Sequence, residues 1–205
     1  MTLLRRRVVG AVAVLAALGL SACAVPGQGD PGVAATYGDR VVTNEQVVAM
    51  SKGYADLGTA PSGAGEALTM LLIGPDLVAE AERLGMSATD AKVQKAAEQW
   101  IAYNQQGGAV TPEARELVHD LLAVFYLLTS TEGIAVLEKA GRDAEAGVVA
   151  SPRYGEFTLA QYSATVNSGI TDVVAAGDTL GTLAFTPFQQ VSGFAGAVPT
   201  WVSGG

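Results

Sequence analysis

The sequence predicts a mostly α-helical domain that is closed by a small β-sheet. Several segments carry apolar residues at helical spacing behind capping residues, which is typical of packed helices. Two short β-like runs lie near the start of the mature chain, and one further β-like stretch, residues 147–157, follows the last of these helical segments. Because a lone strand leaves backbone donors and acceptors unpaired, we expect this late stretch to pair within the chain.

Residues 1–22 have the organisation of a bacterial signal peptide. Arg5-Arg6-Arg7 precedes an apolar run of 13 residues, Val8 to Leu20, which is too short to span a membrane. The sequence Leu20-Ser21-Ala22-Cys23 then resembles a bacterial lipobox, which implies cleavage before Cys23 and attachment of a lipid to its sulfur. An ordinary secretory signal or an uncleaved anchor is the alternative. Export through the Sec route is expected, with the twin-arginine route as the other possibility.

The charge of the chain limits its partners. Loss of the three leader arginines changes the formal net charge from −8 to −11. An acidic body is repelled by nucleic acid and by anionic lipid, so nucleic acid is not an expected partner and the lipid anchor must hold the protein at the membrane. Cys23 is the only cysteine, so no disulfide is expected. The predicted location is the outer face of the bacterial cytoplasmic membrane.

The mature chain begins with signals for a hairpin and a helix. Val33 to Tyr37 and Arg40 to Val42 are short β-like runs, and Gly38-Asp39 between them favours a tight hairpin turn. Thr43 then predicts the start of a helix, because Gln46 stands three residues later and completes a capping box.

Four further helices are predicted from apolar periodicity and capping residues. They cover residues 66–84, about 90–104, 111–128 and 131–144. Gly74-Pro75 predicts a kink or break in the first, because proline removes a helical hydrogen bond. Ser87 and Asp90 predict a capping box at the start of the second. Thr111-Pro112 opens the third, which is the most apolar and is expected to be central.

The last 48 residues differ in composition from the rest of the chain. Residues 158–205 contain no Lys or Arg and only two acids, and no helical stripe is evident. This composition predicts a disordered tail. The expected organisation is therefore a signal peptide over residues 1–22, a flexible tether over 23–32, a helical domain over 33–157 and the disordered tail over 158–205.

The order of these elements resembles the N-terminal domain of the SurA/PrsA-type foldases. The resemblance is carried by VAATYGDRVVTNEQV (33–47), LLIGPDLVAEAERLGMSATDAKV (71–93) and SPRYGEF (151–157). The last is similar to the closing strand of actinobacterial lipoproteins with this domain, with Ser151 in place of the usual Asn. The resemblance implies that residues 148–157 pair with residues 33–42.

No catalytic, cofactor or metal site is predicted. A parvulin-type isomerase module would need about a hundred residues, and no unassigned stretch of that length precedes SPRYGEF. The single histidine, His119, stands beside Glu116 and Asp120, so a solvated or locally bonded histidine is expected. One histidine and one lipidated cysteine do not make a metal cluster, and no Gly-x-Ser-x-Gly motif occurs. Glu80 and Glu82 lie on different faces of one helix.

The resemblance implies a chaperone-like lipoprotein that binds unfolded or nascent exported polypeptides. One alternative is a structural or assembly lipoprotein that binds one specific envelope partner. The other is a peptidyl-prolyl isomerase-related foldase without its catalytic module. Six flexible or aromatic residues suit an apolar binding surface, and each equally suits an ordinary core: Met50, Tyr54, Met70, Met86, Trp100 and Tyr103.

Overall fold

The computed structural model describes residues 32–57, 64–104, 109–176 and 191–195. Within these ranges the helices are α1 (Asn44–Asp56), α2 (Ala64–Arg83), α3 (Asp90–Tyr103), α4 (Pro112–Leu128), α5 (Thr131–Gly147) and α6 (Leu159–Ala176), and the strands are β1 (Val33–Tyr37), β2 (Arg40–Thr43) and β3 (Val148–Ala150). The predicted class, mostly helical with a small antiparallel sheet, is confirmed. Cys23, the signal peptide and nearly all of the tether lie outside the described residues.

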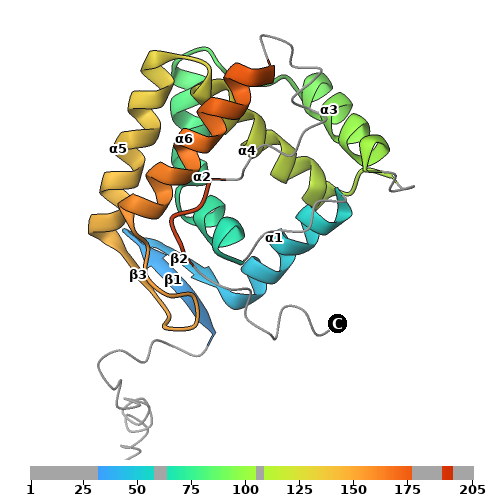
Figure 1. Cartoon of the computed structure of the whole chain (residues 1–205). Helices are drawn as coiled ribbons and strands as arrows, with labels where there is room; N and C mark the ends of the chain where they lie inside the picture. Colours follow the sequence, from blue (N-terminus) through green and yellow to red (C-terminus); the bar gives the residue numbers. More distant parts are fainter. Residues whose placement is uncertain (1–31, 58–63, 105–108, 177–190, 196–205) are drawn as a thin grey trace, which may run out of the picture.

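The sheet lies at one end of the helical body (Figure 1). Its order is β2-β1-β3, and both pairings are antiparallel. Ala35 pairs with Ala150 and Tyr37 with Val148, so the late segment does join the N-terminal hairpin. The strand is shorter than predicted, because it ends at Ala150 and the chain turns at Pro152, which has no backbone N–H to donate to the sheet.

Side-chain hydroxyl groups begin most of the helices. The Thr43 side chain accepts from the backbone N–H of Gln46 at 3.2 Å, and the Gln46 side chain accepts from the Thr43 N–H at 2.8 Å, which completes the predicted capping box. Thr111 caps α4 by accepting from the backbone N–H of Ala114 at 3.2 Å, without a reciprocal bond. The cap of α3 is Thr89 and not Ser87, because the chain enters helical geometry only after Thr89.

Helix α2 runs through Pro75 as one helix, so of the predicted kink or break the break is not present. Proline removes one backbone donor from this turn. Arg40 of β2 binds next to this turn: its guanidinium donates to the Leu72 carbonyl oxygen and forms an ion pair with Asp76 at 2.9 Å. These contacts bind the β1–β2 hairpin to the turn of α2 that contains Pro75.

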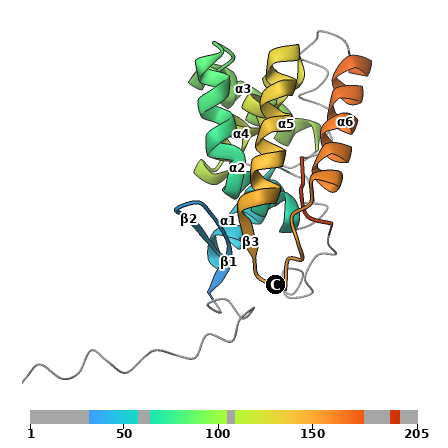
Figure 2. The ribbon, with the colours of Figure 1, turned by 90° about the vertical axis from the view of Figure 1, so that its left-hand side faces the viewer.

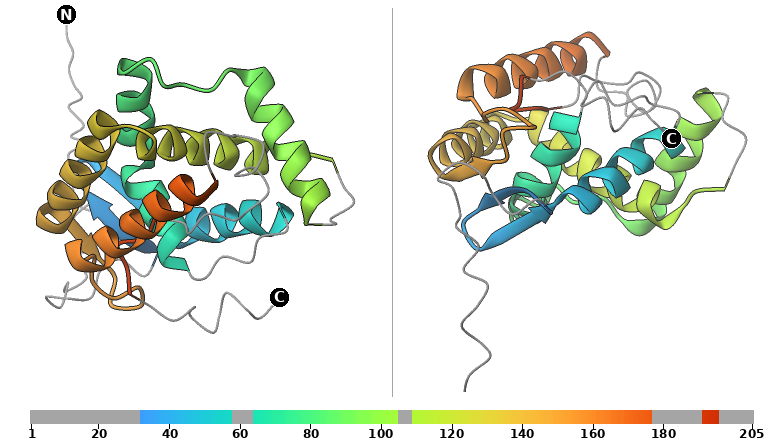
Figure 3. Two further views of the ribbon diagram at one scale, coloured as in Figure 1. Left: turned by 45° about the horizontal axis from the view of Figure 1, so that its top comes forward. Right: turned by 90° about the horizontal axis from the view of Figure 1, so that it is seen from below.

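Helix α4 is the centre of the body, as predicted, and contacts α1, α2, α3, α5 and α6. Its buried residues are Ala114, Leu117, Val118, Leu121, Ala123, Val124, Phe125, Leu127 and Leu128. They face several neighbouring helices at once, which explains why this segment is apolar on most sides. Figure 3 shows α3 at the end of the body far from the sheet, with α6 lying along α5.

Helix α6 lies within the segment that the sequence predicted to be disordered. Tyr162, Val166 and Ile170 are spaced four residues apart and form its packed stripe, with Tyr162 and Val166 buried. The hydroxyl oxygen of Thr158 accepts from the backbone N–H of Gln161 at 3.3 Å and caps the helix. Figure 2 shows α5 and α6 side by side. Apolar spacing, which needs no charged residues, therefore specifies this helix.

A second part of the same segment also packs on the body. Residues 191–195 return to α2 and α6, and Phe194 forms an isolated antiparallel bridge with Phe157. The prediction of disorder is therefore wrong for residues 159–176 and 191–195, and the packed body extends beyond the predicted boundary at residue 157. Residues 177–190 and 196–205 lie outside the described residues.

Candidate functional site

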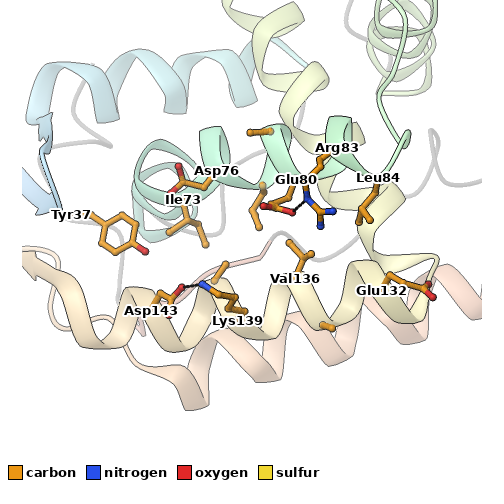
Figure 4. Close-up of a pocket in the computed structure, with 14 residues that line it drawn as sticks. Tyr37, Ile73, Asp76, Glu80, Arg83, Leu84, Glu132, Val136, Lys139 and Asp143 are labelled. Carbon is orange, nitrogen blue, oxygen red and sulfur yellow. Dashed lines mark hydrogen bonds and ion pairs between the residues drawn. The ribbon is translucent and has the colours of Figure 1, made fainter.

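A groove of about 900 Å³ lies between the carboxy-terminal half of α2 and the facing side of α5 (Figure 4). It is lined by Tyr37, Ile73, Asp76, Leu77, Ala79, Glu80, Arg83, Leu84, Glu132, Ala135, Val136, Lys139, Ala140 and Asp143. Tyr37 lies at the sheet end, and Leu84 and Glu132 lie at the other end. Small side chains at Ala79, Ala135 and Ala140 leave the space between the two helices open.

The floor of the groove is apolar. Ile73 and Leu77 are buried and belong to the main core. Val136 and Leu84 are partly exposed and pack against that core, and the exposed Ala135 completes the apolar floor. An apolar side chain of a ligand can therefore lose contact with water here without any rearrangement of the core, and such burial contributes about 25 cal/mol per Å².

The rim of the groove is charged and carries more acids than bases. Its acids are Asp76, Glu80, Glu132 and Asp143, and its bases are Arg83 and Lys139. Arg83 forms an ion pair with Glu80 at 2.7 Å, and Lys139 forms one with Asp143. These pairs are exposed to solvent, so each contributes little to stability and a charged ligand can exchange with either partner. Asp76 is in turn paired with Arg40, so the remaining excess of carboxylates is small, and it favours a cationic over an anionic ligand.

Tyr37 closes the sheet end of the groove. Burial raises the pKa of its hydroxyl, and the nearby carboxylates of Asp143 and Asp76 raise it further. The hydroxyl therefore stays neutral and keeps its proton to donate at physiological pH. This end of the groove offers one donor next to two acceptors, which suits the polar backbone of a peptide.

The six residues considered from the sequence as a binding surface do not line this groove. Tyr54, Met70 and Trp100 are buried in the core. Met50 and Met86 are partly buried against it. Only Tyr103, on α3, is mostly exposed, at 53%. The interpretation as core residues therefore holds for the three that are buried.

His119 and Asp120 form a local pair on α4, with the Nδ1 and Oδ1 atoms 3.2 Å apart. Burial raises the pKa of the Asp120 carboxyl group, and the bond to His119 opposes that effect. This is the locally bonded histidine that the sequence predicted. In the part of the chain that the structure describes, no group of three or more His, Cys, Asp or Glu residues is placed to hold a metal ion.

Comparison with protein-family models, with curated proteins and with solved structures found no match for this chain. Among the described residues, no single helix is both long enough and apolar enough to cross a membrane; α4 and α5 meet those criteria only together, as a pair bent by 116°.

The sequence did not identify the groove, because it depends on two helices that are far apart in the chain. In α5 the buried stripe contains Leu137, Gly141 and Ala144, and the groove residues lie on the adjoining face. A weak signal was present: Ala135 and Val136 extend the apolar surface of α5 beyond that buried stripe. Glu80 and Glu82 do lie on different faces of α2, and only Glu80 lines the groove.

Proposed function

We propose that this protein is a membrane-anchored, extracytoplasmic lipoprotein that binds unfolded or partly folded exported polypeptides as a chaperone, without catalysing a reaction. In this proposal Cys23 carries the lipid, and the groove between α2 and α5 receives the client. The resemblance to SurA/PrsA-type foldases supports the role.

The observation that carries the proposal is the combination of an apolar floor with an acid-rich rim in one groove. A single folded partner is usually recognised by a complementary surface, whereas a groove with an exposed apolar floor accepts many side chains. Segments that combine apolar residues with Lys or Arg fit both the floor and the rim. The driving force is apolar burial, so binding should show a negative heat-capacity change and only modest dependence on salt.

The anchor is tested by the variant Cys23→Ser. Without the sulfur no lipid can be attached, so the protein should move from the membrane fraction to the soluble fraction. Fractionation of cells that express the native chain or the variant measures this directly. Retention of the variant in the membrane at native levels would contradict the lipid anchor.

Client binding is tested with the whole mature chain, residues 23–205, carrying Cys23→Ser. A fragment that ends at residue 157 is unsuitable because it lacks α6. At modest molar excess the protein should slow the aggregation of a chemically denatured client and should leave the rate of Xaa-Pro isomerisation unchanged. Ala135→Glu places a charge on the groove floor and should reduce this protection. Ala49→Glu makes the same change at an exposed position of α1, and should not.

Three outcomes would replace the proposal. In the first, the folded protein neither slows aggregation nor retains denatured clients, and instead recovers one stoichiometric partner from the envelope. That result would make it a specific assembly lipoprotein. Accelerated Xaa-Pro isomerisation would show a foldase activity. Equal protection by Ala135→Glu and Ala49→Glu would place client binding outside the groove.

A further inference from the structure

Residues 191–194, with the sequence Val-Ser-Gly-Phe, lie in a second site on the other half of α2. We call this site the slot; it is formed by Gly65, Thr69, Phe157, Thr158, Tyr162 and Thr165. In Figure 2 the segment runs beside α6, and none of its residues lines the groove between α2 and α5. Val191 and Phe194 are 2% and 4% exposed, so the slot is filled.

The slot recognises the backbone of the segment. The Ser192 N–H donates to the Thr165 hydroxyl at 3.0 Å, and the same hydroxyl lies 3.2 Å from the Ser192 carbonyl oxygen. The Gly193 N–H donates to the Thr69 hydroxyl at 3.1 Å, and the Gly193 carbonyl accepts from the Thr158 N–H at 2.8 Å. Three of the four backbone polar groups of these two residues therefore have a partner of their own, and the Ser192 carbonyl shares the Thr165 proton with the Tyr162 carbonyl, which lies closer, at 2.8 Å.

The slot also selects the side chains that follow that backbone. A Cβ atom on Gly193 would lie 2.1 Å from the Phe157 ring, so only glycine fits at this position. The Phe194 ring meets the Phe157 ring edge-on with 5.5 Å between centroids. On the other side, a Cβ atom on Gly65 would lie 2.8 Å from the Phe194 Cβ atom. The slot thus accepts a glycine followed by an aromatic residue.

Thr69 is the residue of α2 that bonds to the backbone of the segment. It is fully buried within α2 among apolar neighbours, where a polar side chain costs stability unless it is hydrogen-bonded. Its hydroxyl donates to the Gly65 carbonyl oxygen at 2.7 Å, which leaves the oxygen lone pairs to accept the Gly193 N–H. The segment supplies that donor, although it belongs to no helix or named strand.

We propose that the slot is a peptide-binding site for a segment that carries glycine followed by an aromatic residue and bends at that glycine, and that residues 191–194 occupy it as an intramolecular ligand. A segment of the same chemistry from another polypeptide can replace them. Backbone pairing for affinity and side-chain pockets for selectivity are the usual features of such sites. Attachment through the chain gives the internal ligand an effective concentration of the order of millimolar, so it outcompetes weak external peptides. This inference does not rest on the groove or on a chaperone role.

The experiment uses the whole mature chain with Cys23→Ser and a fluorescent synthetic peptide of residues 188–196, FQQVSGFAG. Phe194→Ala removes the aromatic anchor of the internal ligand, and Gly193→Ala expels it by the overlap with Phe157; neither change alters the slot itself. Both variants should bind the peptide in fluorescence anisotropy at least about tenfold more tightly than the native chain, which is occupied. Two variants of the internal ligand are used, so that if circular dichroism shows one of them to be misfolded, the other still tests the proposal.

Two controls define the site. The same peptide with alanine in place of the glycine that precedes phenylalanine should not bind either variant. Adding Thr69→Val to Phe194→Ala removes the hydroxyl that accepts the Gly193 N–H at nearly constant volume, and should weaken peptide binding at least about tenfold. Absence of binding to both folded variants, or equal binding by the variants and the native chain, would overturn the proposal and make residues 191–194 a fixed part of the core.

Discussion

The two halves of α2 present two different kinds of surface. The amino-terminal half, up to Gly74, is buried, and Gly65 and Thr69 hold residues 191–194 through close contacts and matched hydrogen bonds. The carboxy-terminal half, after Pro75, lines the open groove with an apolar floor and exposed ion pairs. One helix thus carries a site that fits one sequence closely and a site whose floor fits many.

The difference follows from what happens to the polar groups of each site when a ligand fits poorly. In the slot, a poor fit leaves buried backbone groups without partners, and each such group costs about 1–3 kcal/mol. In the groove, the polar groups stay in contact with water, so a poor fit loses only some apolar burial. Selectivity therefore comes from buried polar groups, and tolerance comes from an exposed floor.

The largest expected effect on stability concerns the core beneath the amino-terminal half of α2, which residues 191–194 cover. Leu68→Ala removes a fully buried side chain and should lower the free energy of unfolding by about 2–5 kcal/mol. Leu84→Ala makes the same change at a half-exposed position of the groove and should cost clearly less. Urea denaturation followed by circular dichroism measures both. Similar losses would show that the two halves are covered equally.

The next effect concerns close packing at Gly65. In a helix, replacing glycine by alanine normally stabilises by up to about 1 kcal/mol. Here the new methyl group would overlap Phe194, so Gly65→Ala should instead destabilise by about 1–3 kcal/mol or release the segment. Thermal unfolding measures the first, and chymotrypsin cleavage after Phe194 measures the second. If Gly65→Ala stabilises the protein and Phe194 stays protected from chymotrypsin, close packing between Gly65 and Phe194 is contradicted.

A pH-dependent effect is expected at the junction of the two halves, where Asp120 of α4 lies near Gly74. Burial raises the pKa of Asp120 in the folded state, so this carboxyl group holds its proton more tightly there than in the unfolded chain. Its contribution to stability is complete below its ordinary pKa and is lost as the pH rises through the raised value. Asp120→Asn, which cannot ionise, should therefore be more stable than the parent at pH 7 and equal to it in acid.

The matched control for this titration is Glu113→Gln, at an exposed position of the same helix whose charge is not among the causes of the raised Asp120 pKa. It should leave the pH profile of unfolding largely unchanged. If Asp120→Asn is instead less stable than the parent at neutral pH, the ionised carboxylate is held by stabilising contacts and the direction is wrong.

The smallest effect on stability is expected at the rim. Arg83→Gln breaks an exposed ion pair with Glu80 and should change the free energy of unfolding by no more than about 0.5 kcal/mol. It also removes a positive charge from an acid-rich rim, so capture of a Lys-rich denatured client should become tighter at low salt. Anisotropy of a labelled client compares the variant with Arg142→Gln, a similar change on α5 outside the groove. Weaker capture would contradict an electrostatic role of the rim.

Local patterns predicted much of the fold. Thr43 with Gln46 and Thr111 with Pro112 identified two helix starts, because capping depends on neighbouring residues alone. The pairing of residues 148–150 with β1 was also confirmed. Helix α6 was not predicted, because its segment carries almost no charge and the four-residue spacing of its apolar side chains is its main signal.

Neither the slot nor the groove was predictable in the same way. The slot joins Thr69 to Gly193, 124 positions later in the chain, and the groove joins two helices through small side chains that have no distinctive local signature. These relations depend on tertiary packing, which no window of sequence contains.

The most direct test of the central claim is site-specific crosslinking in the groove. In the mature chain with Cys23→Ser, Ala135→Cys and Ala49→Cys each provide one thiol, the first on the groove floor and the second on exposed α1. Each is labelled with a photoactivatable maleimide, mixed with a denatured client and irradiated. The account predicts several-fold more client adduct from Ala135→Cys, suppressed by excess unlabelled client. Equal yields from the two positions would contradict it.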